Sequence, residues 1–150
     1  MKVVVQRVKQ ASVTIDGNPH TAIEKGLLIL LGIAHEDTKD DIDWLVRKIS
    51  GMRIFGDDQG LMNLNVNDIR GEVLVVSQFT LLASTRKGNR PSFIEAAKPD
   101  QAVPLYKLFL SKIGDEIMRP VQAGIFGANM QVHLVNDGPV TIVVDTRSKK

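Results

Sequence analysis

The sequence predicts an α/β fold in which mixed β-sheets are covered by two helices, with three layers in the order α/β/β. Residues 27–33 and 73–76 are apolar at nearly every position, as in strands that are buried on both faces. Residues 42–52 and 106–117 repeat apolar side chains at helical spacing. Strand-like stretches stand before and after these segments. The expected order is therefore two strands, two strand–helix units and three closing strands.

The bulk composition indicates one domain over residues 1–150, long enough to bury a core. The net charge of +2 gives the chain as a whole no strong attraction for polyanions. The absence of cysteine excludes disulfides, thiolate zinc sites and a cysteine nucleophile. The longest apolar run covers nine residues and cannot span a bilayer, and the first residues become polar too early for a signal peptide. We therefore expect a cytoplasmic protein with no membrane partner.

The opening strands are expected at residues 3–8 and 11–16, where apolar and polar side chains are mixed in strand-like runs. A turn at 17–19, with the sequence Gly-Asn-Pro, leads to a returning strand at 20–26. The apolar run at 27–33 follows as a buried strand.

The first helix is expected to begin after Asp37 and Thr38, which are both good N-cap residues. Asp40 and Asp41 place negative charge in its first turn, where the helix dipole favours it. Its buried stripe comprises Ile42, Leu45, Val46, Ile49 and Met52.

The second helix follows a strong strand at 72–82 and is expected to begin near Asp100. Pro104 is then tolerated within the first turn, where amides lack internal partners. Pro120 ends the helix. The buried stripe comprises Tyr106, Phe109, Leu110, Ile113 and Ile117.

The chain closes with a predicted hairpin at 132–145, because Asn136, Asp137 and Gly138 all tolerate the positive φ of a tight turn. Pro139 would stand first in the returning strand, where it cannot donate to the ladder. A Gly–Pro bond is also one of the few that adopt the cis form at small cost. Pro139 is therefore either a simple strand boundary or a functional device.

Metal and phosphate-loop chemistry is not expected. His20, His35 and His133 lie in separate segments, and none has a second histidine at ligand spacing. The glycine-containing stretches at 26–32 and 124–130 lack the phosphate-loop pattern and its lysine. The sequence therefore predicts no metal site and no cofactor.

Polar residues at the end of the strand at 72–82 form a candidate site. Ser77, Gln78 and Thr80 stand where the buried strand emerges, and ligands commonly bind at strand ends in α/β sheets. On composition alone, a strand end that faces water explains these residues better, because neither hydroxyl has a base within the motif.

A basic loop follows this candidate site. Arg86, Lys87 and Arg90 fall within a stretch, 73–94, that contains no acidic residue. Three uncompensated cations beside a pocket suit a phosphate backbone. A solvated loop without a partner is the alternative interpretation.

The segments SQFTL at 77–81 and NDGPVT at 136–141 resemble the signatures of the D-aminoacyl-tRNA deacylases, which remove wrongly attached D-amino acids from tRNA. The resemblance extends over nearly the whole chain through shorter motifs: QRV, ASV, RIF, MNLNV, RPSF and GIFGANM. Asn129 stands where the family often has an aspartate.

The resemblance implies a hydrolase that cleaves the ester bond of D-aminoacyl-tRNA and of glycyl-tRNA, releasing the amino acid and free tRNA. It also implies a homodimer whose site lies where the two subunits meet. In this family the Gly–Pro pair is cis and enters the pocket of the partner subunit. By this match Gly138 and Pro139 form a chirality filter for proofreading in translation, because their carbonyl oxygens accept from the substrate's α-ammonium and an L side chain would clash with backbone.

Arg7 is implied by the same match to hold the Gly–Pro segment in place, and an ordinary outward strand residue is the alternative. The catalytic residues implied are Ser77, Gln78, Phe79 and Thr80. Backbone amides around Phe79 and Thr80 would stabilise the oxyanion.

Attack by water, assisted by the neighbouring ribose hydroxyl and oriented by Thr80 and Gln78, is favoured over a Thr80 nucleophile, because the motif offers no base. Phe79 either packs against the terminal adenosine or lines the pocket, with core packing as the alternative. The tRNA would contact Arg86, Lys87 and Arg90. Two other functions stay open: a non-catalytic tRNA- or RNA-binding module and a metal-dependent hydrolase.

Overall fold

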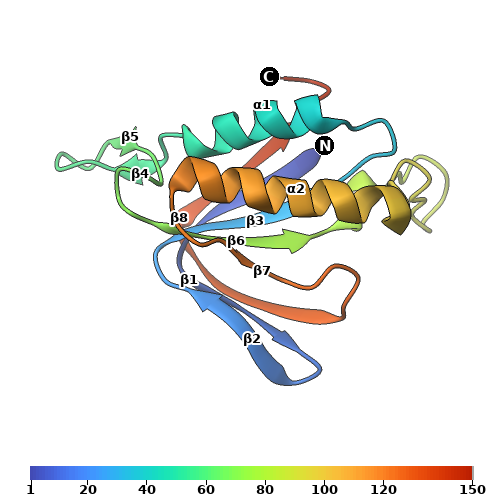
Figure 1. Cartoon of the computed structure of the whole chain (residues 1–150), viewed down its shortest axis with the longest axis horizontal. Coiled ribbons are helices and arrows are strands. Elements are labelled where there is room, and N and C mark those ends of the chain that lie inside the picture. The colour runs from blue at the N-terminus through green and yellow to red at the C-terminus, as the bar shows by residue number, and fades with distance from the viewer. Residues whose placement is uncertain (150) are drawn as a thin grey trace.

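A curved sheet of six strands forms the centre of the computed structural model, which describes residues 1–149 (Figure 1). The strand β1 (Lys2–Ile15) pairs along one side with β8 (Met130–Asp145) in antiparallel fashion. On its other side, the first half of β1 pairs with β3 (Gly26–Gly32) and the second half with β2 (Asn18–Ile23). The long strand β1 therefore connects all the antiparallel parts of the sheet.

The parallel part of the sheet consists of β3, β6 (Glu72–Ser77) and β7 (Gln122–Ala123). All residues of β3 but one and the central four residues of β6, 73–76, are buried, which confirms the prediction from their apolar runs. Side chains of β2 reach β7: His20 Nε2 lies 3.0 Å from the Ala123 carbonyl oxygen, and Thr21 Oγ1 donates to Gln122 Oε1 over 2.6 Å. These contacts bring two edges together, so the sheet is nearly closed like a barrel.

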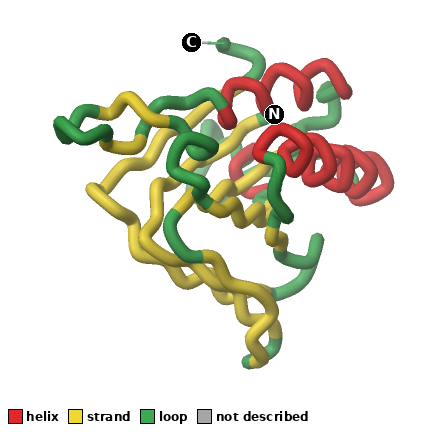
Figure 2. Tube along the Cα trace, turned by 60° about the vertical axis from the view of Figure 1, so that its left-hand side comes forward, coloured by secondary structure: helices red, strands yellow, loops and turns green. Residues whose placement is uncertain are grey.

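Two helices, α1 (Lys39–Ser50) and α2 (Pro99–Ile117), lie on the same face of the sheet (Figures 1 and 2). They pack their apolar stripes into one core with β1, β3 and β6. The buried stripe residues are Ile42, Leu45, Val46, Ile49, Tyr106, Phe109, Ile113 and Ile117. Met52 and Leu110 are half-buried against the same core. The two predicted helices and their stripes are thereby confirmed.

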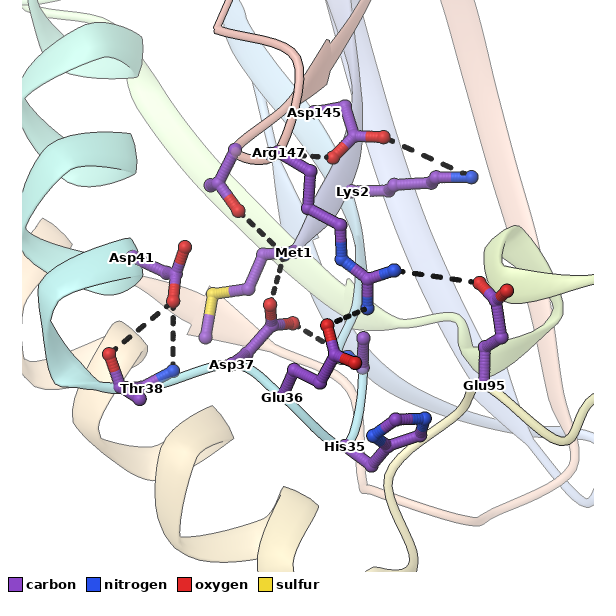
Figure 3. A network of polar contacts seen from close by, with 12 residues as sticks. Met1, Lys2, His35, Glu36, Asp37, Thr38, Asp41, Glu95, Asp145 and Arg147 are labelled. Carbon is purple, nitrogen blue, oxygen red and sulfur yellow. Dashed lines mark hydrogen bonds and ion pairs between the residues drawn. The ribbon is translucent and has the colours of Figure 1, made fainter.

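The start of α1 is fixed by a capping box. Thr38 is the N-cap, its side chain accepts from the Asp40 amide over 3.3 Å, and the Asp41 carboxylate accepts from the Thr38 amide over 2.9 Å. Asp37 has a different role. Its carboxylate accepts from the Met1 ammonium over 2.6 Å and from the Ala34 amide over 2.6 Å (Figure 3).

The Met1 ammonium is buried where the beginning of β1, the end of β8 and the start of α1 meet. It also donates to Thr146 Oγ1 over 2.8 Å, while the Thr146 amide donates to the Met1 carbonyl over 2.9 Å. The side chain of Asp37 is only 2% exposed. An ion pair that is shielded from water in this way ties three elements together.

The position predicted for Pro104 is wrong. α2 begins one residue before Asp100, with Pro99 at its first position and Lys98 as N-cap, so Pro104 stands in the second turn. Pro99 fits the first position because an amide there has no internal acceptor. The proline inside the helix is exposed, as is Asp100, whose carbonyl loses its helical donor and can be hydrated instead.

The predicted C-terminal hairpin is also wrong, because residues 132–145 belong to the single strand β8. In the pairing with β1, Val8 faces Asn136 and Gln6 faces Thr141, so four residues, 137–140, oppose Arg7 alone. The turn-forming residues thus make a large bulge rather than a reversal. For the same reason the chain closes with two strands, β7 and β8, instead of three. The opening stretches at 3–8 and 11–16 are one strand, β1.

The segment between α1 and β6 contains a small sheet that was not expected from the sequence, formed by β4 (Phe55–Gly56) and β5 (Met62–Leu64). It projects from one end of the molecule (Figure 1). Over residues 1–149, no helix is long and apolar enough to cross a membrane.

Candidate active site

The end of β6 carries the expected catalytic residues to one edge of the sheet. Ser77 is the last residue of β6 and is half-buried. The Gln78 amide donates to the Leu31 carbonyl over 2.7 Å, which continues the ladder for one more residue. A short 3₁₀ helix, η1 (Phe79–Leu82), then turns the chain away and leaves Phe79 and Thr80 exposed.

The side chains of Gln78 and Thr80 are joined directly, because Gln78 Nε2 donates to Thr80 Oγ1. The Thr80 hydroxyl oxygen therefore accepts one hydrogen bond, and the hydroxyl proton can still be donated to another group. Among the residues that the structure describes, no histidine, lysine or carboxylate forms a hydrogen bond with Thr80. The pair is suited to orienting a bound molecule, and within residues 1–149 no basic side chain accepts a hydrogen bond from the hydroxyl.

A pocket of about 270 Å³ opens beside these residues. Ser77, Gln78 and Phe79 line one side, and the loop 126–130 lines the other. The loop is held to the sheet by the Gly124 amide, which donates to the Val75 carbonyl over 2.9 Å. The residues of this loop are not among the site residues predicted from the sequence. The glycines at 124 and 127 indicate a loop, but only the parallel pairing of β7 with β6 brings it beside Ser77.

Tyr106 of α2 fixes this loop from the core side. Its hydroxyl donates to the Gly124 carbonyl over 3.1 Å and lies 3.4 Å from the Val75 carbonyl. Its ring lies 5.7 Å from that of Phe126, which lines the pocket. Burial raises the pKa of the Tyr106 phenol to about 12.

The ionisation of Tyr106 is directly measurable, because it is the only tyrosine in the sequence. We expect tyrosinate absorbance to appear near pH 12 in the folded protein and near pH 10 after unfolding. Since the folded pKa is the higher one, the stabilising contribution is complete below pH 10 and is lost as the pH rises towards 12. The loss amounts to about 1.4 kcal/mol for each unit between the two pKa values.

Tyr106→Phe is the control for this titration. The difference in unfolding free energy between the variant and the wild type should shrink over the same alkaline range, and the absorbance step should vanish. A folded-state titration near pH 10 would contradict the burial of the hydroxyl.

Phe79 links the pocket to the basic loop. Its ring packs edge-on against Phe93, with centroids 5.2 Å apart and planes at 72°. Because Phe79 is 55% exposed, the alternative that it packs in the core is wrong. Backbone hydrogen bonds of 2.8 and 2.9 Å between Ser84 and Ser92 close the neck of the loop between them.

The three cations of this loop, Arg86, Lys87 and Arg90, are all exposed. Over residues 1–149 none of them forms an ion pair. They therefore present uncompensated positive charge next to the pocket.

Gly138 and Pro139 lie at the tip of the bulge in β8, where both are exposed, and the peptide bond between them is cis. Arg7 contacts this bulge: its Nε donates to the Asp137 carbonyl over 3.0 Å and lies 3.7 Å from the Asp137 carboxylate. Its Nη1 donates to the Ile54 carbonyl over 2.7 Å. With these contacts Arg7 is not an ordinary outward strand residue.

Within one chain, the Gly–Pro bulge and the end of β6 lie at opposite ends of the sheet. Arg7 pairs with Leu27 of β3, whereas Ser77 pairs with Leu31, four residues further along. At about 3.3 Å per residue, this offset alone amounts to about 13 Å. The bulge lies beside β4 and β5, and the basic loop lies beyond the other end of the sheet (Figure 1).

No group of three or more His, Cys, Asp or Glu side chains able to hold a metal ion is found within the described residues. The polar groups of the site belong instead to Ser, Gln, Thr and the backbone.

A family model described as D-Tyr-tRNA(Tyr) deacylase matches residues 4–145. The chain belongs to this family. The resemblance expected from the sequence is thereby confirmed, and with it the expectation that this member of the D-Tyr-tRNA(Tyr) deacylase family is an enzyme.

Curated relatives of this deacylase family match the chain over its whole length. Proteins named D-aminoacyl-tRNA deacylase from Flavobacterium johnsoniae and Flavobacterium psychrophilum are 56% and 58% identical over 150 residues, which is all of both chains. A solved structure titled c-Myc DNA Unwinding Element Binding Protein has a TM-score of 0.91 and 46% identity, covering 97% of this chain and 98% of its own.

A second solved structure, titled as a probable eukaryotic D-amino acid tRNA deacylase, has a TM-score of 0.83 and covers 95% of this chain and 97% of its own. At 15% identity it shows the fold alone. The deacylase fold is thus retained when most of the sequence differs.

Proposed function

We propose that this chain hydrolyses the ester bond of D-aminoacyl-tRNA, and of glycyl-tRNA, in the cytoplasm and so removes D-amino acids from translation. The observation that carries the proposal is the hydrogen bond between Gln78, which lines the pocket beside β6, and Thr80. The sequence identity of 56% and 58% to curated D-aminoacyl-tRNA deacylases, over the full length of the chain, supports it.

A homodimer is part of this proposal. One chain keeps its exposed Gly138–Pro139 bulge far from its own Ser77–Thr80 segment. A two-fold axis would bring the bulge of each subunit to the pocket of the other, because a symmetric contact repeats itself in both directions.

The proposal includes the α/β/β layering, which a second apolar cluster supports: it contains Val8, Ala11, Val13, Ile23, Leu28, Leu74 and Val76.

The specificity is proposed to come from backbone at Gly138 and Pro139. Main-chain oxygens there would accept hydrogen bonds from the α-ammonium of the substrate, while the scissile ester lies at the end of β6. With these two groups fixed, a D side chain points to open space and an L side chain meets backbone. Because glycine has no side chain, glycyl-tRNA makes no such clash and is also hydrolysed. A rigid wall of this kind rejects the wrong enantiomer without depending on which amino acid is attached.

The chemistry proposed is direct attack by water on the ester carbonyl. The water oxygen forms a new bond to the carbonyl carbon, and the bond between that carbon and the ribose oxygen breaks. The ribose oxygen takes up the proton that the water loses, with the help of the neighbouring ribose hydroxyl. The amides of Phe79 and Thr80 have no acceptor within η1, because they are its first two residues. They are available as oxyanion donors, each worth about 10²–10³ in rate.

The tRNA is proposed to lie along the loop that carries Arg86, Lys87 and Arg90, with Phe79 against its terminal adenosine. A non-catalytic RNA-binding module would use the same three cations. Both functions predict tRNA binding that weakens as the salt concentration rises. Only the enzyme releases amino acid.

The test is a comparison of D- and L-tyrosyl-tRNA as substrates of the purified protein. We expect release of D-tyrosine and protection of the L-ester, with no effect of a chelator. Equal rates on the two esters would refute chiral proofreading, and salt-sensitive binding without release would favour the RNA-binding module. Inhibition by the chelator would favour a metal-dependent hydrolase.

Thr80→Ala separates the two chemical routes. If Thr80 orients water, the variant should keep kcat within about 10²-fold of the wild type on D-tyrosyl-tRNA. Loss of a nucleophile would cost about 10⁶-fold. Single-turnover hydrolysis measures either value. Thr14→Ala is the matched control, because Thr14 lies on β1 opposite Gln131 and belongs to neither the pocket lining nor the basic loop.

A further inference from the structure

The bulge at 137–140 is closed at its base by a second set of side chains, which do not contact the Arg7 guanidinium. Asn136 is the last residue paired with β1 before the bulge, and Thr141 is the first one after it. Asn136 Nδ2 donates to the Val140 carbonyl over 2.9 Å and to the Arg7 carbonyl over 2.9 Å. The amide of Asn136 thus spans the bulge and fastens it to β1.

Thr141 fixes the orientation of this amide. Its Oγ1 donates to Asn136 Oδ1 over 3.0 Å, and Gln6 Nε2 lies within 3.4 Å of the same hydroxyl. Both hydrogens of Asn136 Nδ2 are therefore used, and its oxygen has a donor. If the amide were turned over, its oxygen would face two carbonyl oxygens.

The two fastenings act on different ends of the bulge. Arg7 holds the carbonyl of Asp137 at the beginning, and Asn136 holds the carbonyl of Val140 at the end. Asn136 also binds the main-chain carbonyl of Arg7 itself. A shift of Gly138 and Pro139 in either direction therefore breaks hydrogen bonds at one end.

We infer that Asn136 and Thr141 are positioning residues that set the chiral selectivity of the Gly138–Pro139 segment. The inference rests on the proposed function. Neither side chain touches the substrate; both act through the backbone that does. A wall that rejects L-amino acids works only if it cannot yield, and misplacement by about 1 Å can change a rate by about 10²-fold.

The experiment measures kcat/KM for D- and L-tyrosyl-tRNA in three variants. Thr141→Val keeps the shape of the side chain and loses the hydroxyl, Thr141→Ser keeps the hydroxyl, and Asn136→Asp keeps the acceptor and loses both donors. We expect the D/L ratio to fall by about tenfold or more in Thr141→Val and Asn136→Asp. In Thr141→Ser, the D/L ratio should equal that of the wild type.

A merely structural role predicts a different result. Loss of folded protein lowers both rates by the same factor and leaves their ratio unchanged. Thr14→Val is the matched control, because Thr14 lies on β1 opposite Gln131 and away from the bulge. Its D/L ratio should equal that of the wild type.

The outcomes separate the inference from the proposed function. If the wild type discriminates and both Thr141→Val and Asn136→Asp discriminate equally well, the inference is overturned and the proposed function stands. If the wild type itself does not discriminate, the proposed function fails. If Asn136→Asp does not fold, the contrast between Thr141→Val and Thr141→Ser decides the question.

Discussion

Gly138→Ala is expected to reduce the hydrolysis of D-tyrosyl-tRNA by about 10²-fold. Gly138 has a φ of +129°, which L side chains rarely adopt. A Cβ atom there would lie 2.9 Å from Val140 Cγ2, 3.0 Å from Arg7 Nη2 and 3.1 Å from the Val140 amide nitrogen. The amide nitrogen is backbone and cannot turn aside, so the bulge must move.

The measurement is kcat/KM on the D-ester together with the free energy of unfolding. Gly60→Ala is a matched control in the same region, because Gly60 also has a positive φ, of +78°, but nothing lies within 4 Å of its added Cβ. It has the backbone cost of a left-handed residue, about 1–2 kcal/mol, without the crowding. Full activity in Gly138→Ala would show that the bulge does not meet the substrate.

Asp37→Ala is expected to lower the free energy of unfolding by about 3–5 kcal/mol, because it leaves the buried Met1 ammonium without its counter-ion. The ammonium is fully buried, and the Asp37 side chain is 2% exposed, so water cannot replace the carboxylate. The Ala34 amide loses its acceptor as well. Urea unfolding followed by the fluorescence of Trp44, the only tryptophan, measures the change.

Asp37→Asn and Asp43→Asn complete this test. Asp37→Asn keeps an oxygen for the ammonium but removes the charge, and should be intermediate. Asp43 lies on α1 at the surface, where Lys112 and Lys39 lower the pKa of its carboxyl to about 2. Such exposed pairs contribute little. A loss in Asp43→Asn as large as that in Asp37→Ala would contradict the argument from burial.

Features with local causes were predictable from the sequence. Thr38 and Asp41 form their capping box within four residues, and the apolar runs of β3 and β6 need no distant information to be recognised as strands. The polar strand end at 77–80 was visible for the same reason. Each of these depends on neighbours in the sequence.

Features that depend on distant partners were not predictable in this way. Asn136, Asp137 and Gly138 have the preferences of a turn, but the edge of β1 offers their strand a continuous partner and converts the turn into a bulge. Aspartate is a preferred N-cap residue, but the carboxylate of Asp37 accepts a hydrogen bond from the Met1 ammonium instead of capping α1. The pocket wall at 126–130 reaches Ser77 only through the crossover of α2.

The long pairing of β1 with β8 also bears on how the chain acquires its structure. β1 is synthesised before both helices, and β8, the strand that covers one of its sides, is synthesised after them. Until then that side exposes unpaired amides and carbonyls to other nascent chains. Closing such a large loop is slow compared with forming local contacts. Native pairing of β1 with β8 is therefore expected to be a late step of folding.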